Sequence, residues 1–285
     1  MSGGGCRLGG VRRIVVRRHG SALGAWEMAS APAGPHLRGL VHSYVGYTER
    51  TLAPLRRREV PSGFVTLIIS FGDPMRVTIG PGQTVTSFVA GLHEQPAITE
   101  HAGRQQGIEV RLTPLGGYAL LRTPMHLLAN TVVDLPALVG GSLVDRLACA
   151  PDWAARFALL DAALAGLLDA GRPAAPEVAW AWHRLRASAG RISVADLTGE
   201  VGWSHRHLAA RFREQVGLTP KAAARVLRFE RALGLLRPGS SLAGVAVAAG
   251  FYDQAHLHRD FRALAGCTPT EYLSAQLPDG GGTGA

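Results

Sequence analysis

The spacing of hydrophobic positions changes partway along the chain. Between residues 63 and 112 apolar positions alternate with polar ones, as they do in strands that bury one face. Four runs with this period are separated by turn-forming glycines and prolines, and an earlier run is a candidate for a further strand; they cover 65–71, 75–79, 85–89 and 108–112, with the earlier one at 40–47. The pattern predicts antiparallel strands in a small barrel or a sandwich.

Beyond Pro114 the spacing approaches 3.6 residues and predicts helices near 115–128, 134–147 and 152–170. The segment 171–176 is rich in proline and small residues, and it interrupts this pattern as a linker does.

The chain therefore divides into four parts. We expect a β-rich sensor or dimerisation domain over 25–172 and a helical domain over 173–277. The two ends, 1–24 and 278–285, are rich in glycine and are predicted to be disordered. The fold class is α+β.

The last hundred residues contain an internal repeat. Residues 195–204 align with 243–252, and after one inserted residue the apolar and glycine positions of 208–220 align with those of 257–269. Each copy predicts a short helix, a glycine turn and a longer helix, which is the layout of a helix-turn-helix motif. The second helix of such a motif can enter the major groove of DNA.

Capping signals agree with these boundaries. Ser193, Ser204 and Asp253 stand where N-caps are expected, and Thr268 opens a Thr-Pro-Thr-Glu sequence with the spacing of a capping box. A glycine follows each of the two longer helices, where a C-cap glycine is expected.

Each longer helix has an apolar stripe and, opposite it, a basic face. These faces carry two arginines and small residues: Arg206, Ala210 and Arg213 with Ala209 at the flank, and Ala255, Arg259 and Arg262 with His258 at the flank. An arginine can bond guanine through two hydrogen bonds or neutralise a phosphate, and an alanine can touch a thymine methyl group. A solvated surface would explain one such face, but two copies with the same rotation favour DNA binding.

One helix over 220–236 is predicted between the two copies. Its seventeen residues span about 25 Å, and successive major grooves on one side of B-DNA lie about 34 Å apart. With the width of the two units added, this helix can hold both on one face of a duplex.

These features resemble the DNA-binding domain of the AraC/XylS family over residues 177–277. The resemblance is carried by 201–208, 212–220, 227–236, 249–254 and 261–269. It implies seven helices, with two helix-turn-helix units joined by a connecting helix. In this family a second domain usually senses a small molecule or mediates dimerisation, and residues 25–170 resemble its cupin-like sensor domains by pattern alone.

The resemblance implies base contacts from three positions in the first unit and four in the second. With the neighbouring basic residues, the predicted DNA-contacting set is His205, Arg206, Ala209, Ala210, Arg213, Gln254, Ala255, His258, Arg259 and Arg262. Many family members carry longer polar residues where this chain has alanine. Arg206, Gln254 and Arg259 are therefore the stronger candidates for reading bases.

Histidine spacing could also indicate a metal site. His205 and His207, like the pair 256 and 258, lie on predicted helices, where residues two apart diverge by about 200° and cannot share one ion. His93, His101 and Glu109 are scattered over the β-rich part. We expect no catalytic residue, metal or cofactor, and a metal-dependent cupin-type enzyme fused to a DNA-binding domain stays as an alternative.

The net charge of +9 is unevenly distributed. Residues 1–24 hold five basic and no acidic side chains, residues 25–176 hold twelve of each, and residues 177–277 hold thirteen basic and eight acidic ones. A segregated positive domain indicates a polyanionic partner, nucleic acid before membrane. A non-specific architectural DNA binder is therefore a second alternative.

The three cysteines, Cys6, Cys149 and Cys267, lie far apart in the sequence. They suit a reducing cytosol, and alone they provide neither a disulfide framework nor a zinc site. No stretch approaches the eighteen continuous apolar residues of a transmembrane helix.

The sequence thus predicts a cytoplasmic, sequence-specific DNA-binding transcription regulator of AraC type, with an N-terminal domain that modulates it. Its expected partner is double-stranded DNA. RNA polymerase, a small-molecule effector and a second copy of the chain are further candidate partners, and a membrane is not.

Overall fold

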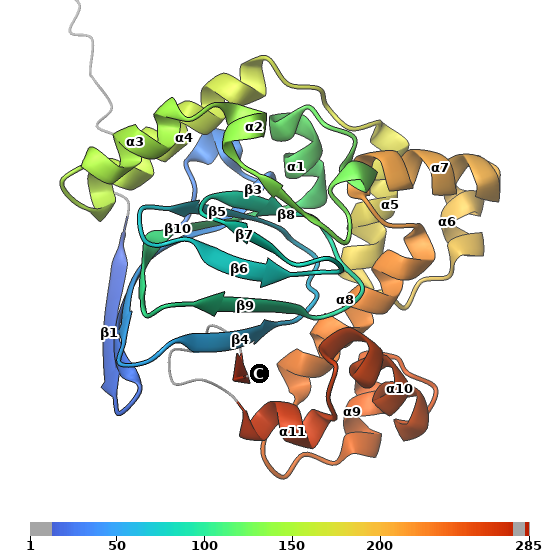
Figure 1. Cartoon of the computed structure of the whole chain (residues 1–285). Coiled ribbons are helices and arrows are strands. Elements are labelled where there is room, and N and C mark those ends of the chain that lie inside the picture. The colour runs from blue at the N-terminus through green and yellow to red at the C-terminus, as the bar shows by residue number, and fades with distance from the viewer. Residues whose placement is uncertain (1–12, 276–282, 285) are drawn as a thin grey trace, which may run out of the picture.

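The structure is a computed structural model, and it describes residues 13–275 together with 283 and 284. A β-rich N-terminal part is followed by a helical C-terminal part that packs against one end of the strands (Figure 1). Cys6 and the rest of residues 1–12 lie outside the described residues, as does most of the predicted disordered tail.

The strands form two antiparallel sheets that face each other. The larger sheet has seven strands in the order β1 (Val15–Ser21), β2 (Gly24–Ala31), β3 (Val41–Thr51), β10 (Arg104–Leu112), β5 (Val65–Ser70), β8 (Phe88–Ala90) and β11 (Val132–Asp134). The smaller sheet has the order β12 (Thr283–Gly284), β4 (Leu55–Glu59), β9 (Ala97–His101), β6 (Met75–Thr78) and β7 (Gln83–Val85).

The predicted β-rich domain is present, but the cupin-like closed barrel is not confirmed. Over the described residues each sheet is open, because no strand pairing joins the two ends of either sheet. Of the two architectures that the sequence allowed, the arrangement is that of a sandwich.

The prediction that residues 1–24 are disordered is wrong for β1. This strand pairs along its whole length with β2, from Val15 opposite Ser30 to Ser21 opposite Gly24. All seven of its residues are exposed, so it lacks the apolar alternation by which strands are found in a sequence. Backbone pairing holds it, together with an ion pair of 2.8 Å between Arg18 Nε and Glu27 Oε2.

Two residues of the tail predicted to be disordered also form structure. Thr283 and Gly284 pair with Arg58 and Arg57 of β4, and the Thr283 side chain is buried. Strands β2, β4, β9 and β11 likewise fell outside the runs that the alternation identified.

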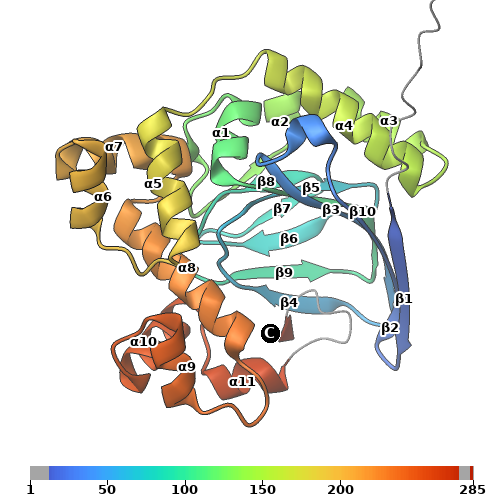
Figure 2. The same ribbon diagram turned by 180° about the vertical axis from the view of Figure 1, so that it is seen from behind.

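Helices cover the outer face of the larger sheet (Figures 1 and 2). They are a short η1 (Pro35–Leu37), then α1 (Pro114–Leu121), η2 (Met125–Leu127), α2 (Pro136–Val139), α3 (Ser142–Cys149) and α4 (Trp153–Asp169). The first predicted helix stops early, because Arg122 adopts a left-handed conformation with φ 54°. The second is two helices, since Gly140 with φ 80° separates α2 from α3. The third is confirmed as α4.

Alternation along β3 determines which residues face which layer. Tyr44 packs under α4 with its ring 5.7 Å from that of Phe157, and Gly46 leaves room for Trp153. The side chains that alternate with them along β3, such as Val45 and Tyr47, point the other way, toward the smaller sheet.

Between residues 173 and 275 the structure describes seven helices, the number that the resemblance implied. They are α5 (Pro176–Ala187), α6 (Val194–Val201), α7 (His205–Val216), α8 (Pro220–Leu235), α9 (Leu242–Ala249), α10 (Gln254–Ala265) and α11 (Pro269–Ser274). The connection from α4 to α5 covers residues 170–175 and overlaps the segment 171–176 that was predicted as a linker.

Candidate DNA-binding surface and interdomain cavity

Two helix-turn-helix units are formed by α6 with α7 and by α9 with α10. The turns are made by Gly202 and Gly250 in left-handed conformations, with φ 69° and 87°. Ser204 Oγ accepts a hydrogen bond from the backbone N–H of His207, and Asp253 Oδ1 accepts one from that of His256. The predicted caps therefore fix where both longer helices begin.

The first longer helix, α7, separates its faces as the sequence predicted. Leu208, Phe212 and Val216 are fully buried. The predicted DNA-contacting residues His205, Arg206, Ala210 and Arg213 are exposed, and Ala209 is half-buried.

The second longer helix, α10, repeats this arrangement with one difference. Leu257, Phe261 and Ala265 are buried, while the predicted contacts Gln254, Ala255, Arg259 and Arg262 are exposed. His258 is half-buried, and its Nε2 atom is covered and without a hydrogen-bond partner among the described residues. Its ring would have to turn outward to touch a base.

The connecting helix α8 holds the second unit through polar contacts. Arg225 Nε of α8 donates to Asp260 Oδ1 of α10 at 2.9 Å, and Asp260 is 8% exposed. His256 Nε2 lies 3.6 Å from the other oxygen of the same carboxylate. Arg228 Nη1 of α8 donates to the carbonyl oxygen of Gly190 at 2.8 Å, which fixes α8 to the turn after α5.

Sequence reasoning missed Tyr252, which precedes α10 and is 90% exposed. The alignment of the two repeats could have identified this residue. Tyr252 aligns with the cap Ser204, but the cap of α10 is Asp253, one residue later, so the tyrosine is left outside the helix with its ring in solvent.

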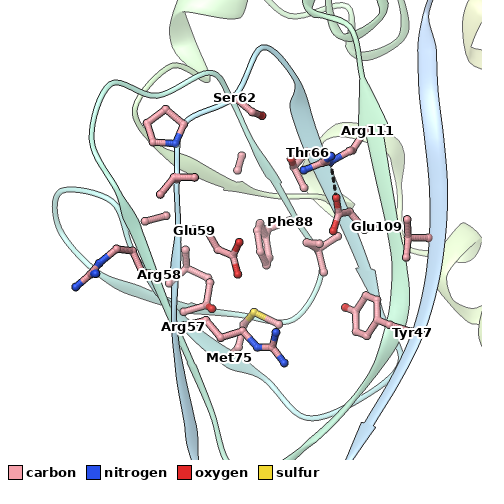
Figure 3. A pocket seen from close by; sticks show the side chains of 18 of the residues that line it. Tyr47, Arg57, Arg58, Glu59, Ser62, Thr66, Met75, Phe88, Glu109 and Arg111 are labelled. Atoms are coloured by element: carbon pink, nitrogen blue, oxygen red, sulfur yellow. Dashed lines mark ion pairs between the residues drawn. The ribbon is translucent and has the colours of Figure 1, made fainter. Parts of the chain in front are cut away.

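A cavity of about 560 Å³ lies between the two sheets (Figure 3). Strands of both sheets line it, and the C-terminal part contributes Glu230 and Leu233 of α8 and Tyr272 of α11. The cavity is therefore shared between the two parts of the chain.

One end of the cavity is formed by a row of residues across three neighbouring strands. Trp26 of β2 pairs with Glu49 of β3, and Glu49 pairs with Gln105 of β10. From the smaller sheet, Arg57 Nη2 donates to Glu49 Oε1 at 2.6 Å, and His101 Nε2 lies 3.6 Å from Glu49 Oε2. A buried ion pair thus links the two sheets.

Burial keeps the titratable groups of this region neutral unless they are paired. Burial lowers the pKa of His101. The negative charge of Glu49 raises this pKa, and the positive charge of Arg57 lowers it further. Burial, followed by the charges of Glu109 and Glu49, raises the pKa of Tyr47 far above its usual range, so that its phenol stays protonated.

The opposite end of the cavity lies at the junction with the C-terminal part. The Gly63 N–H donates to Glu230 Oε2 at 3.2 Å, and the same oxygen lies 3.4 Å from Arg186 Nη1. The Arg186 guanidinium lies over the Phe64 ring at 4.7 Å, and the His42 ring is stacked 4.4 Å from the same ring. A polar and aromatic cluster therefore joins β3 and its neighbours to α5 and α8.

The residues considered for a metal site do not form one. The two histidine pairs lie on α7 and α10, where their members diverge. His93, His101 and Glu109 all line the cavity, but each has a polar partner elsewhere, namely the carbonyl of Gln95, the N–H of Gly103 and the guanidinium of Arg111. No group of three or more histidine, cysteine or acidic side chains in the described parts of the chain is placed to hold a metal ion.

The described cysteines are unpaired, with Cys149 exposed and Cys267 buried. Among the helices of residues 13–275, none is both long and apolar enough to cross a membrane.

Two family models match separate parts of the chain. Residues 197–275 match a helix-turn-helix domain, and residues 30–134 match a domain of unknown function, DUF6597. The uncharacterized HTH-type transcriptional regulator YbfI of Bacillus subtilis is 35% identical over 66 residues, which is 23% of this chain and 24% of that protein. The matched region thus spans about a quarter of that relative's length.

Solved structures also align with the chain. A probable AraC family transcriptional regulator from Rhodopseudomonas palustris is 28% identical over 35% of this chain and 96% of that one, with a TM-score of 0.32. An apo ToxT variant from Vibrio cholerae is 12% identical over 81% of this chain and 97% of that one, with a TM-score of 0.48.

The two capped units, their connecting helix and the family match define the C-terminal part as a double helix-turn-helix domain. This domain is of the AraC type, and the resemblance found in the sequence is confirmed.

Proposed function

We propose that this chain is a sequence-specific DNA-binding transcription regulator, in which α7 and α10 enter successive major grooves. The observation that carries the proposal is the pair of exposed basic faces on two capped recognition helices, both held by the single helix α8. An arginine-bearing helix face that is free of tertiary contacts is suited to base edges and phosphates.

The exposed residues divide by the chemistry they offer. Arg206 and Arg259 lie centrally on their faces and suit guanine, and Gln254 at the start of α10 suits adenine. The remaining predicted contacts suit phosphates or methyl groups, and they are His205, Ala209, Ala210, Arg213, Ala255, His258 and Arg262.

The N-terminal part modulates this activity through the shared cavity. Residues of α8 and α11 line the same space as the two sheets, so a molecule bound there contacts the DNA-binding part directly. A ligand that binds one position of α8 more tightly than another can change DNA affinity by at most that difference in binding free energy.

Selection of bound sequences from random duplex DNA tests this function. We expect a motif with two half-sites about one helical turn apart. Recovery of no motif, with affinity that falls steeply with salt on every duplex, would instead identify a non-specific architectural binder.

RNA polymerase and a second copy of the chain remain candidate partners. Co-purification with polymerase and light scattering of the DNA-bound protein test them separately.

A further inference from the structure

Strand β1 leaves one edge of the larger sheet open. It is the first strand in the sheet order, and within the described residues only β2 pairs with it. The Leu52 N–H donates to the Leu23 carbonyl at 3.1 Å, so the odd-numbered residues of β2 bond to β3 and the even-numbered ones bond to β1. The register of β1 with β2 then leaves the backbone groups of Val16, Arg18 and Gly20 pointing away from the sheet.

Apart from its charge, β1 has none of the features that usually protect the edge of a sheet. Natural edge strands are blocked by proline, by bulges or by a covering segment. β1 contains no proline, its register with β2 is continuous from Val15 to Ser21, and all seven of its residues are exposed. Its open N–H and C=O groups can therefore form hydrogen bonds with an added strand.

The charge along this edge is positive. β1 and the two residues before it hold Arg13, Arg17 and Arg18 and no acidic residue. Arg18 pairs with Glu27 of β2, whereas Arg13 and Arg17 have no acidic partner in the described part of the chain. Figures 1 and 2 show β1 at the end of the sheets that lies away from α7 and α10, so these arginines are remote from DNA held by the recognition helices.

Exposed apolar side chains flank the arginines. Val15 and Val16 lie at one end of β1, and both are exposed. At the other end lie Leu23, in the turn between β1 and β2, and Leu52, which is bonded to it and is 86% exposed. Four of the seven exposed large apolar side chains in the described residues thus lie on β1 or beside its turn. Such a concentration favours a surface that a partner covers.

A second copy of β1 matches this edge poorly. The antiparallel register that pairs all seven residues places Arg18 opposite Arg18 and Arg17 opposite His19. Like charges directly opposite each other destabilise a sheet, whereas opposite charges stabilise it. An anionic lipid surface would meet the arginines but would leave the open backbone groups without partners. A strand that carries carboxylates satisfies both the backbone and the charge.

We propose that β1 accepts an extended acidic segment of another protein as an added strand. The backbone of this segment bonds to Val16, Arg18 and Gly20. Its carboxylates lie opposite Arg17 and His19, which share one face of β1, and its apolar residues cover the exposed valines and leucines. The inference goes beyond the proposed function, because the DNA-binding faces of α7 and α10 take no part in it.

Three peptides of equal length test the added strand on the full chain. The first is Val-Thr-Glu-Val-Glu-Thr-Val, the second has lysine in place of both glutamates, and the third has proline in place of the central valine. Microscale thermophoresis measures their dissociation constants. We expect the acidic peptide to bind about tenfold more tightly than either control, because lysine reverses the charge and proline blocks the ladder. Equal binding of a control, or no binding of the acidic peptide up to about 1 mM, would overturn the inference.

Variants of β1 locate the bound peptide. Arg17→Glu should reverse the preference in favour of the lysine peptide, while the matched control Arg146→Glu, at an exposed arginine of α3, should keep it. Val16→Pro removes an N–H that β2 does not use and should weaken acidic peptide binding about tenfold, whereas Val16→Thr should not. Circular dichroism checks the fold of each variant. An unchanged preference in Arg17→Glu, or unchanged affinity in Val16→Pro, would contradict the assignment to β1.

Two further measurements test the other occupants of this edge. Analytical ultracentrifugation compares the oligomeric state of the chain with that of Val16→Pro, and co-sedimentation with phosphatidylserine vesicles compares the chain with Arg17→Glu. We expect neither variant to differ from the unmodified chain. A dimer that Val16→Pro abolishes would identify a second copy as the occupant, and vesicle binding that Arg17→Glu abolishes would identify a lipid surface. Either result would overturn the inference.

Discussion

The arginines on α7 and α10 are exposed to solvent because other residues of the same helices are buried. Arg206 and Arg259 are exposed because Leu208 and Leu257, two residues away on their helices, are fully buried and fix the helix rotation. Helix capping by Ser204 and Asp253 then sets the first residue of each helix. Both devices are local, so the sequence could reveal them.

Replacing Arg259 by alanine tests base reading at one position. We expect specific binding to weaken by about 1–3 kcal/mol and one base preference to relax, because a base contact is lost. Fluorescence anisotropy on the selected duplex and on its single-base variants measures both. Arg231→Ala, an exposed arginine of α8 away from the recognition faces, is the control. An equal loss on specific and random DNA would identify Arg259 as a phosphate contact instead.

At the scale of elements, α10 is placed by α8 through one buried carboxylate. The Asp260 carboxylate accepts a hydrogen bond from Arg225 and lies near His256, and it is too buried to contact DNA itself. The orientation of the second recognition helix therefore depends on a contact between helices that are far apart in sequence.

The variant Asp260→Asn removes this charge while keeping the side-chain shape. We expect a loss of about 1–3 kcal/mol in the free energy of unfolding, together with weaker specific DNA binding. Urea unfolding and anisotropy measure the two effects. Glu214→Gln is the control, because the Arg211–Glu214 pair lies on the surface of α7 alone and should contribute less than about 0.5 kcal/mol. Full specific affinity in Asp260→Asn would show that this contact does not position α10.

For the whole molecule, the junction between the two parts is a cluster of charge and aromatic rings. Glu230 accepts from the Gly63 N–H, and Arg186 covers Phe64. Glu230 also lines the cavity, so one residue of α8 contacts both the cavity and the N-terminal part.

Glu230→Ala should loosen the junction. Loss of a hydrogen bond to a charged group, about 1.5–3 kcal/mol, predicts that exchange of the Gly63 amide hydrogen accelerates about tenfold or more. Hydrogen–deuterium exchange with mass spectrometry measures the exchange rate in the peptide that contains Gly63. Glu200→Ala removes a comparable ion pair, with Arg184, that lies within the C-terminal part, and it should leave Gly63 unaffected. Equal exchange in both variants would exclude Glu230 as the junction contact.

Acid should destabilise the folded chain below pH 6.5. Burial is the main cause that lowers the pKa of His42, His93 and His101 in the fold, so the unfolded chain binds their protons first as the pH falls. Stability is then present above the ordinary value of 6.5 and is lost toward the lowered values.

Urea unfolding at pH 7.5 and 5.5 measures this dependence. One face of the His42 ring is covered by Phe64 and the charges of Arg111 and Arg186 lie near it, while the rest of the side chain is open to solvent. His42→Gln should therefore reduce the pH dependence while the protein still folds. Stability that is constant or rises toward pH 5.5 would refute the prediction.

The amino-acid sequence alone determined the C-terminal domain. Its caps, turn glycines and 3.6-residue period each lie within a few residues of the feature they predict, and the repeat shows the same local signals twice. The exposed faces of α7 and α10 follow from that local periodicity.

The cavity, in contrast, was decided by the tertiary structure. Alternation in residues 108–112 showed that Glu109 and Arg111 lie opposite the apolar face, and such polar positions usually meet solvent. Here the smaller sheet, together with α8 and α11, covers that face and encloses a cavity. Strand periodicity gives the two faces of a sheet, but only long-range packing determines what covers each face. For the same reason β1, which buries neither face, had no signal in the sequence.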